Sequence, residues 1–84
     1  MVRVKALYFA AARELLGLRE EKIDLGDAPT TATFRATLAT KYPHAAEYIQ
    51  DITLAVNLEY VLGDDVRRLH DDDEVALIPP ISGG

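Results

Sequence analysis

The sequence predicts a small α+β domain with one main helix and about five strands. Its 84 residues are enough for one domain, because chains divide into two only at roughly twice that length. The hydrophobic fraction of 49% is typical of a globular protein and too high for a disordered one. Strand-like alternation and helix-like spacing follow each other without a repeat or a linker, so the elements belong to one compact unit.

The first third of the chain is predicted to form two strands around a short helix. Residues 2–9 are rich in β-branched and aromatic side chains, as strands are. Residues 10–16 are good helix formers, and Gly17 is in position to cap the end of that helix. Residues 21–25 alternate polar and apolar side chains, which predicts a second, half-exposed strand.

The main helix is predicted to begin after Thr30 and to run to about Lys41. Threonine is a favoured N-cap residue, because its hydroxyl accepts from the free N–H groups of the first turn. The helix should end at Tyr42, since the residue before a proline resists helical backbone angles. Residues 44–50 are expected to add one further turn. The side chains that should form the buried stripe of the main helix are Thr31, Phe34 and Leu38.

The C-terminal half is predicted to hold three strands. Residues 53–56 form the first, which turns at Asn57, and residues 59–61 form a short second one. The acidic run at residues 71–73 turns the chain into a last strand over residues 74–78. Alternation then assigns the side chains of the first and last strands to two faces. The set expected to lie under the helix is Val4, Ala6, Tyr8, Val75 and Leu77, and the set expected to face outward is Leu7, Phe9, Ala76 and Ile78.

Composition and charge exclude several classes of function. The chain has no cysteine, so it can form no disulfide, thiolate nucleophile or zinc–thiolate site. Its net charge of −5 argues against nucleic acid as the main partner, because phosphate contacts need a basic face. The first 42 residues carry +2 and the last 42 carry −7, which either suits a basic partner surface or is ordinary solvated surface. No stretch approaches the ~20 apolar residues of a membrane span, and we expect a cytoplasmic protein.

The sequence indicates no metal site and no nucleotide site. The acids at residues 71–74 are consecutive, whereas a calcium-binding EF-hand loop needs ligands at alternate positions, so we expect them to be solvated surface. His44 and His70 have no histidine or cysteine at ligand spacing. Ser82 has no evident base to activate it. No glycine-rich phosphate loop is present to bind ATP.

Three stretches, in order along nearly the whole chain, carry a family resemblance. Residues 9–17 read FAAARELLG, residues 55–57 read AVN, and residues 73–84 read DEVALIPPISGG. In these motifs the chain resembles the small subunits of molybdopterin synthase, the MoaD family of ubiquitin-like sulfur carriers. The resemblance implies a β-grasp fold with a mixed sheet, a folded domain over residues 1–78 and a flexible tail over residues 79–84.

One departure from the family pattern is visible. Similar proteins usually have glycine where this chain has Asp72, between two other acids. Aspartate tolerates left-handed backbone angles better than most residues, so we expect the turn to survive at some cost in stability.

The tail is predicted to be the working part of the chain. Pro79 has no N–H, so strand pairing should stop there, and Pro79-Pro80 stiffens the exit from the sheet. Residues 81–84 span roughly 13 Å when extended, at about 3.3 Å per residue. Gly83 and Gly84 supply a chain without Cβ atoms, which fits a narrow active site.

The resemblance implies what that tail carries. A partner of the ubiquitin-activating type would use ATP to adenylate the Gly84 carboxylate, and sulfur from a persulfide donor would then displace AMP and leave a thiocarboxylate. A large subunit, in a heterotetramer of two small and two large chains, would transfer the sulfur to cyclic pyranopterin monophosphate. The small subunit itself would bind no cofactor and would be a non-catalytic sulfur donor.

The same resemblance assigns partner contacts. The positions that match the family's contacts with the large subunit are Phe9, Tyr60 and Ile78. The tail residues Pro79, Pro80, Ile81 and Ser82 are also predicted to bind the partner. Contiguous exposed apolar surface of this kind usually marks a partner site. Arg13 has two open interpretations, as an ordinary surface residue or as a contact for the activating enzyme.

Three alternatives remain at this stage. A sulfur carrier for thiamine or for tRNA thiolation would use the same terminus with a different acceptor. A ubiquitin-like modifier would form isopeptide bonds with lysines of target proteins. An interaction module with an inert tail would tolerate a residue added after Gly84, whereas a carrier would fail.

Overall fold

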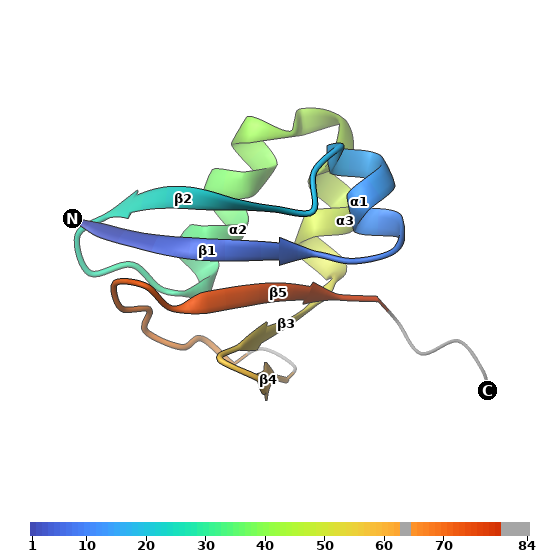
Figure 1. Cartoon of the computed structure of the whole chain (residues 1–84). Coiled ribbons are helices and arrows are strands. Elements are labelled where there is room, and N and C mark those ends of the chain that lie inside the picture. The colour runs from blue at the N-terminus through green and yellow to red at the C-terminus, as the bar shows by residue number, and fades with distance from the viewer. Residues whose placement is uncertain (63–64, 80–84) are drawn as a thin grey trace.

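The computed structural model describes residues 1–62 and 65–79 of the chain (Figure 1). Within these residues the strands and helices alternate much as the sequence predicts. In chain order the elements are β1 (Val2–Tyr8), α1 (Ala11–Leu16), β2 (Glu20–Gly26), α2 (Thr31–Lys41), the 3₁₀ turn η1 (Pro43–Ala45), α3 (Ala46–Asp51), β3 (Thr53–Val56), β4 (Glu59–Val61) and β5 (Glu74–Ile78).

The five strands form one mixed sheet in the order β2-β1-β5-β3-β4. The first and last strands are the parallel pair, with Tyr8 opposite Leu77, and the other neighbouring strands are antiparallel. Figure 1 shows α2 crossing behind β1 and β2, with α1 and α3 on the same side of the sheet. A mixed sheet crossed by one main helix is the β-grasp arrangement, and this expectation is confirmed.

The main helix begins and packs as predicted. The Thr30 hydroxyl accepts from the N–H groups of Ala32 and Thr33, and the Thr33 hydroxyl accepts from the N–H of Thr30, which makes a reciprocal capping box. The chain leaves the helix at Tyr42, before Pro43. The stripe at helical spacing is buried, and it consists of Thr31, Phe34 and Leu38.

The segment after the main helix is longer than predicted. In place of one turn over residues 44–50, the structure has η1 followed by the six-residue helix α3. Ile49 is 1% exposed and joins the core, so the burial of its side chain accounts for the extra helical turn. Arg35 of α2 donates to the carbonyl oxygens of Ile49, at 2.7 Å, and Gln50, at 3.2 Å, and ties the two helices together.

Two turns at one end of the sheet are linked by hydrogen bonds. Asn57 and Leu58 both have positive φ, 50° and 73°, as a tight hairpin between β3 and β4 requires. Asp72 has φ 69°, so the left-handed conformation expected at this position is confirmed. The Asn57 amide donates to Asp73 Oδ1 at 2.9 Å, and Asn57 Oδ1 accepts from the N–H of Glu74 at 3.0 Å.

The acidic run is therefore more than solvated surface. Asp71 accepts from the N–H of Arg3 at 2.9 Å, and the second carboxylate oxygen of Asp73 accepts from the N–H of His70 at 2.8 Å. These carboxylates satisfy backbone donors that the turn would otherwise leave unpaired. Asp71 is exposed as expected, but the Asp73 side chain is only 15% exposed. The expectation of solvated surface was wrong for Asp73, because an acid at a strand entrance can cap its own turn.

A half-buried carboxylate joins β2 to the end of α2. Glu21 accepts from the hydroxyl of Tyr8 at 2.7 Å, from the hydroxyl of Tyr42 and from the ammonium of Lys41. Burial alone would raise the pKa of Glu21, but the hydrogen bonds from Lys41, Tyr42 and Tyr8 together hold it below its ordinary value. Burial and the neighbouring carboxylate raise the pKa of Tyr42 to about 12. We call these four residues the Glu21 cluster.

Candidate partner-docking face and tail

The side-chain alternation predicted for the first and last strands is confirmed. The set expected under the helices is at most 1% exposed: Val4, Ala6, Tyr8, Val75 and Leu77. On the opposite side of the sheet, Leu7, Ala76 and Ile78 are half-buried and Phe9 is 39% exposed. The helices lie on one side of the sheet, so the second set forms part of an uncovered side (Figure 1).

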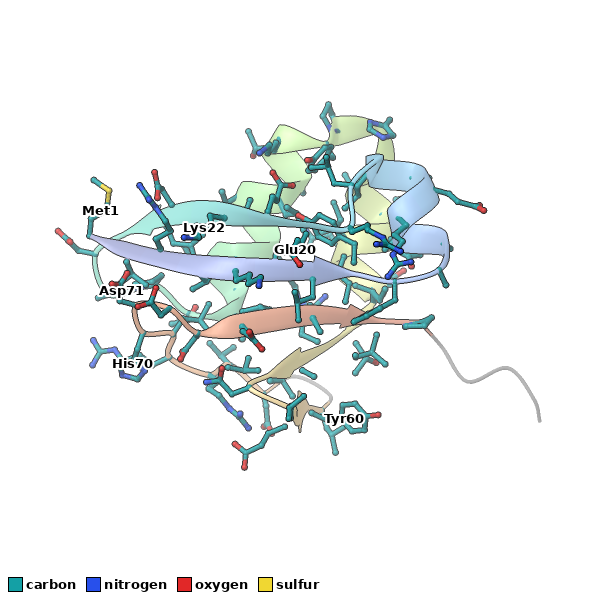
Figure 2. The ribbon with its side chains drawn as sticks, in the orientation of Figure 1. Met1, Glu20, Lys22, Tyr60, His70 and Asp71 are labelled. Carbon is teal, nitrogen blue, oxygen red and sulfur yellow. The ribbon has the colours of Figure 1, made fainter. Side chains whose placement is uncertain are left out.

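An apolar hollow of about 250 Å³ lies on this uncovered side. Its apolar lining residues, which we call the outer face, are Leu7, Phe9, Ala55, Leu58, Tyr60, Ala76 and Ile78. Leu58 is 94% exposed and Tyr60 is 59% exposed, and Figure 2 shows Tyr60 at the β4 end of the sheet. Large exposed apolar side chains gathered around a hollow are typical of a partner surface.

The strand register explains why the hollow exists. Leu7 pairs with Ala76, Ala76 with Ala55, and Ala55 with Tyr60, so one row of side chains crosses four strands. The two middle members of this row are alanines, and the two ends are large. Small side chains between large ones leave a depression that another chain's side chain can fill.

The outer face is apolar at one end and charged at the other. Toward the start of β1 the same side carries Lys5, whose ammonium lies 3.2 Å from a carboxylate oxygen of Glu20. Figure 2 shows Glu20 and Lys22 along β2, with Met1 and Asp71 at the far end. Charged side chains therefore border the apolar part of this side at one end, as polar residues border the apolar core of a protein–protein interface.

The root of the tail lies beside the outer face. Ile78 is the last residue of β5 and lines the hollow, and Pro79 follows it as the last described residue. Because β1 and β5 are parallel, β5 ends at the same end of the sheet as Phe9. The predicted site residues Pro80, Ile81, Ser82, Gly83 and Gly84 lie outside the described residues.

The turn that follows Phe9 is strained. Ala10 has φ 47° and ψ −121°, and the N–H of Ala12 donates to the carbonyl oxygen of Phe9 at 3.0 Å. These angles match the first central position of a type II′ turn, which glycine dominates. An alanine with these backbone angles costs of order 1–3 kcal/mol of conformational free energy, so the surrounding contacts must hold the turn in this conformation.

Arg13 lies against this turn. Its Nε donates to the carbonyl oxygen of Tyr8 at 3.0 Å, and its guanidinium carbon lies 5.8 Å from the centre of the Phe9 ring. Arg13 is therefore a partly exposed residue with specific contacts inside the chain, and its interpretation as a contact for the activating enzyme stays a prediction. Sequence reasoning missed the strain at Ala10, the Arg13 contacts and the hollow between Ala55 and Ala76, because each depends on pairing or geometry that no local pattern reveals.

The described residues contain no group of three or more histidine, aspartate or glutamate side chains arranged to hold a metal ion. Among the helices of residues 1–62 and 65–79, none has the length and apolar character that crossing a bilayer demands.

Comparison with known proteins places the chain in a family. The ThiS family matches residues 6–84, a range that begins within β1 and ends at Gly84. The chain belongs to the ThiS family. It is 40% identical to the molybdopterin synthase sulfur carrier subunit of Chlamydomonas reinhardtii, over 99% of this chain and 100% of that protein. It is 39% identical to the subunit of the same name from Homo sapiens, over 100% and 97%.

Solved structures agree with this assignment. The putative molybdopterin converting factor subunit 1 from Pyrococcus furiosus superposes with a TM-score of 0.78 at 28% identity, over 96% of this ThiS-family chain and 100% of that one. Two neighbours under 25% identity support the fold alone. They are the small archaeal modifier protein 1 of Haloferax volcanii (TM-score 0.81, 20% identity, 96% and 100% covered) and a chain from the complex of molybdopterin-converting factor subunits 1 and 2 of Helicobacter pylori (0.68, 20%, 99% and 100%).

Proposed function

We propose that this chain is the sulfur carrier subunit of a molybdopterin synthase, which acts in the biosynthesis of the molybdenum cofactor. The observation that carries the proposal is the match to sulfur carrier subunits over the whole chain, at 33–40% identity in proteins from green alga to bacterium. The ThiS family match also includes the terminal Gly83-Gly84. A cysteine-free chain that carries sulfur must hold it on a group other than a side-chain thiol, and the terminal carboxylate is that group.

The chemistry takes place at the C-terminus. A ubiquitin-activating-type adenylyltransferase binds ATP, transfers AMP to the Gly84 carboxylate and releases pyrophosphate. The carboxylate, a poor electrophile, thereby becomes a reactive mixed anhydride. The outer sulfur of a persulfide donor attacks this carbonyl carbon and AMP leaves, which forms an acyl disulfide between the donor and Gly84. A thiol then attacks the donor's sulfur in that S–S bond, the donor leaves as a disulfide with that thiol, and the thiocarboxylate remains on Gly84. The nucleotide belongs to the activating partner, and this chain is its substrate.

The large subunit binds the outer face and receives the tail. The apolar hollow between Leu7, Phe9, Tyr60 and Ile78 supports this docking mode, because it lies at the end of the sheet from which the tail departs. Docking there directs the tail residues Pro79 to Ser82 toward the large subunit's active site, where Gly84 donates sulfur to cyclic pyranopterin monophosphate. The Helicobacter pylori neighbour was solved as a complex of subunits 1 and 2. The assembly holds two small and two large subunits, in the cytoplasm.

The first test is the intact mass of the purified chain after incubation with an activating enzyme, ATP and a sulfur donor. We expect a gain equal to the exchange of one oxygen for one sulfur atom. A chain that lacks Gly84 is the matched control and should show no gain. If the complete chain gains no mass with an activating enzyme that is competent on another carrier, the sulfur carrier proposal is wrong.

A second step separates the acceptors. The thiocarboxylated chain is mixed with the large subunit and cyclic pyranopterin monophosphate, and molybdopterin is measured. Molybdopterin formation supports the proposal. Loading without molybdopterin formation would instead favour a carrier for thiamine or tRNA thiolation, and covalent high-mass conjugates in cells would favour a protein modifier.

A further inference from the structure

The turn between β1 and α1 combines a strained residue with an exposed aromatic one. Ala10 adopts backbone angles that favour glycine, and the preceding residue, Phe9, stands on the rim of the outer face. Phe9 is 39% exposed, so core packing does not fix its position. A strained turn persists only where neighbouring contacts over-determine it, and such turns are often part of a functional site.

We propose that Arg13 is a positioning residue of the sulfur carrier, which holds this strained turn closed and so keeps Phe9 on the rim of the outer face beside the root of the tail. The inference rests on the proposed function, because the large subunit is the partner that contacts Phe9. It assigns Arg13 an intramolecular role instead of direct contact with a partner.

Arg13 contacts three consecutive residues of the turn. Its side-chain Nε donates to the carbonyl oxygen of Tyr8 at 3.0 Å, its guanidinium lies over the Phe9 ring at 5.8 Å, and its own N–H donates to the carbonyl oxygen of Ala10 at 3.0 Å. A guanidinium that donates to a strand-end carbonyl and covers an aromatic ring makes both a charge-assisted hydrogen bond and a cation–π contact. Together these contacts span the strained residue on both sides.

The helix that carries Arg13 is itself fixed. Ala12 and Leu16 of α1 are buried in the core, at 0% and 7% exposed. At the far end of the helix the carbonyl oxygen of Leu15 lies 2.9 Å from Nε2 of His44, and the N–H of Gly17 donates to the carbonyl oxygen of Arg13 at 2.8 Å. The turn also has a main-chain hydrogen bond of its own, from the N–H of Ala12 to the carbonyl oxygen of Phe9 at 3.0 Å. Arg13 adds to it, from an anchored helix, contacts to Tyr8 and to the Phe9 ring.

The expected consequence of losing Arg13 is a displaced Phe9. Without the guanidinium, Ala10 can relax from its positive φ, and the residue before it moves with the backbone. Replacing Ala10 by glycine removes the strain, because glycine adopts this conformation without steric cost. The two positions are therefore coupled, and a double-mutant cycle measures that coupling.

The experiment measures the dissociation constant of the complete chain for the purified large subunit, in wild type, R13A, A10G and the double variant A10G/R13A. We expect R13A to weaken binding on the order of tenfold, since it removes a charge-assisted hydrogen bond. A10G should bind as wild type does, and A10G/R13A should recover most of the lost affinity. The rate of sulfur transfer at saturating large subunit should stay unchanged, because Phe9 positions the complex and does not touch the reacting atoms.

Arg35 supplies a matched control. It too donates from its guanidinium to main-chain carbonyl oxygens, those of Ile49 and Gln50, but it lies between α2 and α3. R35A should therefore lower the unfolding midpoint. Its dissociation constant for the large subunit should stay within about twofold of the wild-type value, as expected for a substitution outside an interface. An equal loss of affinity in R35A and R13A would assign the effect to general destabilisation and overturn the proposal.

Two further outcomes would overturn it. If R13A weakens binding by the same factor in the wild-type chain and in the A10G chain, Arg13 contacts the partner directly. If R13A binds as wild type does, Arg13 is not needed to hold the turn.

NMR spectroscopy of the free chain gives a readout that is independent of function. Slow hydrogen exchange of the Arg13 Nε–H and a single set of Phe9 ring signals support the role of Arg13 in holding the turn, and a fast-exchanging Nε–H contradicts it. A wild-type chain that neither gains sulfur nor binds the large subunit would refute the proposed function, and this spectroscopic test would still decide the role of Arg13.

Discussion

Alternate side chains of β1 and β5 point to the two faces of the sheet and have different roles on each. On the inner face, β1 and β5 present Val4, Tyr8, Val75 and Leu77 to the helices, where they are fully buried. On the outer face, the intervening residues line an open hollow with two alanines at its centre. The inner side chains stabilise the fold. Most of the outer ones are half-buried or exposed in the free chain, and under the proposed function a partner covers them. A substitution on the inner face should therefore act mainly on stability, and one on the outer face mainly on docking.

The largest expected effect on stability is on the inner face. Phe34→Ala removes a 0% exposed side chain from the buried stripe of α2, and the cavity should lower the free energy of unfolding by about 3–5 kcal/mol. Urea unfolding followed by circular dichroism measures it. Phe9→Ala is the matched variant on the outer face and should lower this free energy by less than about 1 kcal/mol. Similar losses in both variants would contradict the division between the faces.

The largest expected effect on docking comes from filling the hollow. Ala76 lies between Leu7 and Ala55 in the transverse row, so Ala76→Leu should occupy the space that the partner's side chain needs. We expect affinity for the large subunit to fall by on the order of tenfold or more, as at an interface centre, with the unfolding midpoint unchanged. Titration calorimetry measures the affinity. Unchanged affinity would place the docking surface elsewhere.

The Glu21 cluster should make the stability of the folded chain decrease at acid pH. Because the pKa of Glu21 is lowered in the folded chain, its contribution is fully present above the unfolded pKa near 4.3 and is lost as the pH falls through the folded value. Glu21→Gln should cost about 1–3 kcal/mol at pH 7, since Tyr8, Tyr42 and Lys41 lose a charged acceptor. Urea unfolding at pH 7, 5 and 3 should show a smaller difference at pH 3. A difference that grows toward acid would contradict this sign.

The smallest expected effect concerns the start of α2. Thr30→Ala removes the acceptor for the N–H groups of Ala32 and Thr33 and should cost about 1 kcal/mol. Thermal unfolding measures this loss, and Thr30→Ser, which keeps the hydroxyl, is its control. Binding of the large subunit should not change, because Thr30 lies on the helix side of the sheet. Weaker binding in Thr30→Ala would mean that the two faces are coupled.

Much of the inner face could be predicted from the sequence because its signals are local. The spacing of Thr31, Phe34 and Leu38 identifies the buried stripe, and Thr30 identifies the helix start. Alternation in β1 and β5 correctly assigns Phe9 and Ile78 to the outward set. The tail assignments, from Pro80 to Gly84, stay predictions.

The outer face needs information that no local pattern holds. The hollow arises because pairing brings Ala55 beside Ala76, and Ala76 beside Leu7, which is 69 residues away in the chain. The positive φ of Ala10 is equally hidden, because alanine gives no signal of a glycine-like turn. Arg13 was left with two interpretations for the same reason, since its contact with Tyr8 exists only once that turn has formed.

The segment that follows β5 is attached to the strand that completes the sheet. Among the described residues, the last strand along the chain is the central strand of the sheet, held by β1 on one side and β3 on the other. A nascent or truncated chain without residues 74–78 lacks the strand that joins the two halves of the sheet, so it cannot display a finished carrier surface. Under the proposed function, the segment that carries sulfur directly follows the strand that closes the sheet. A force applied to the end of β5 is shared by its two neighbours, β1 and β3.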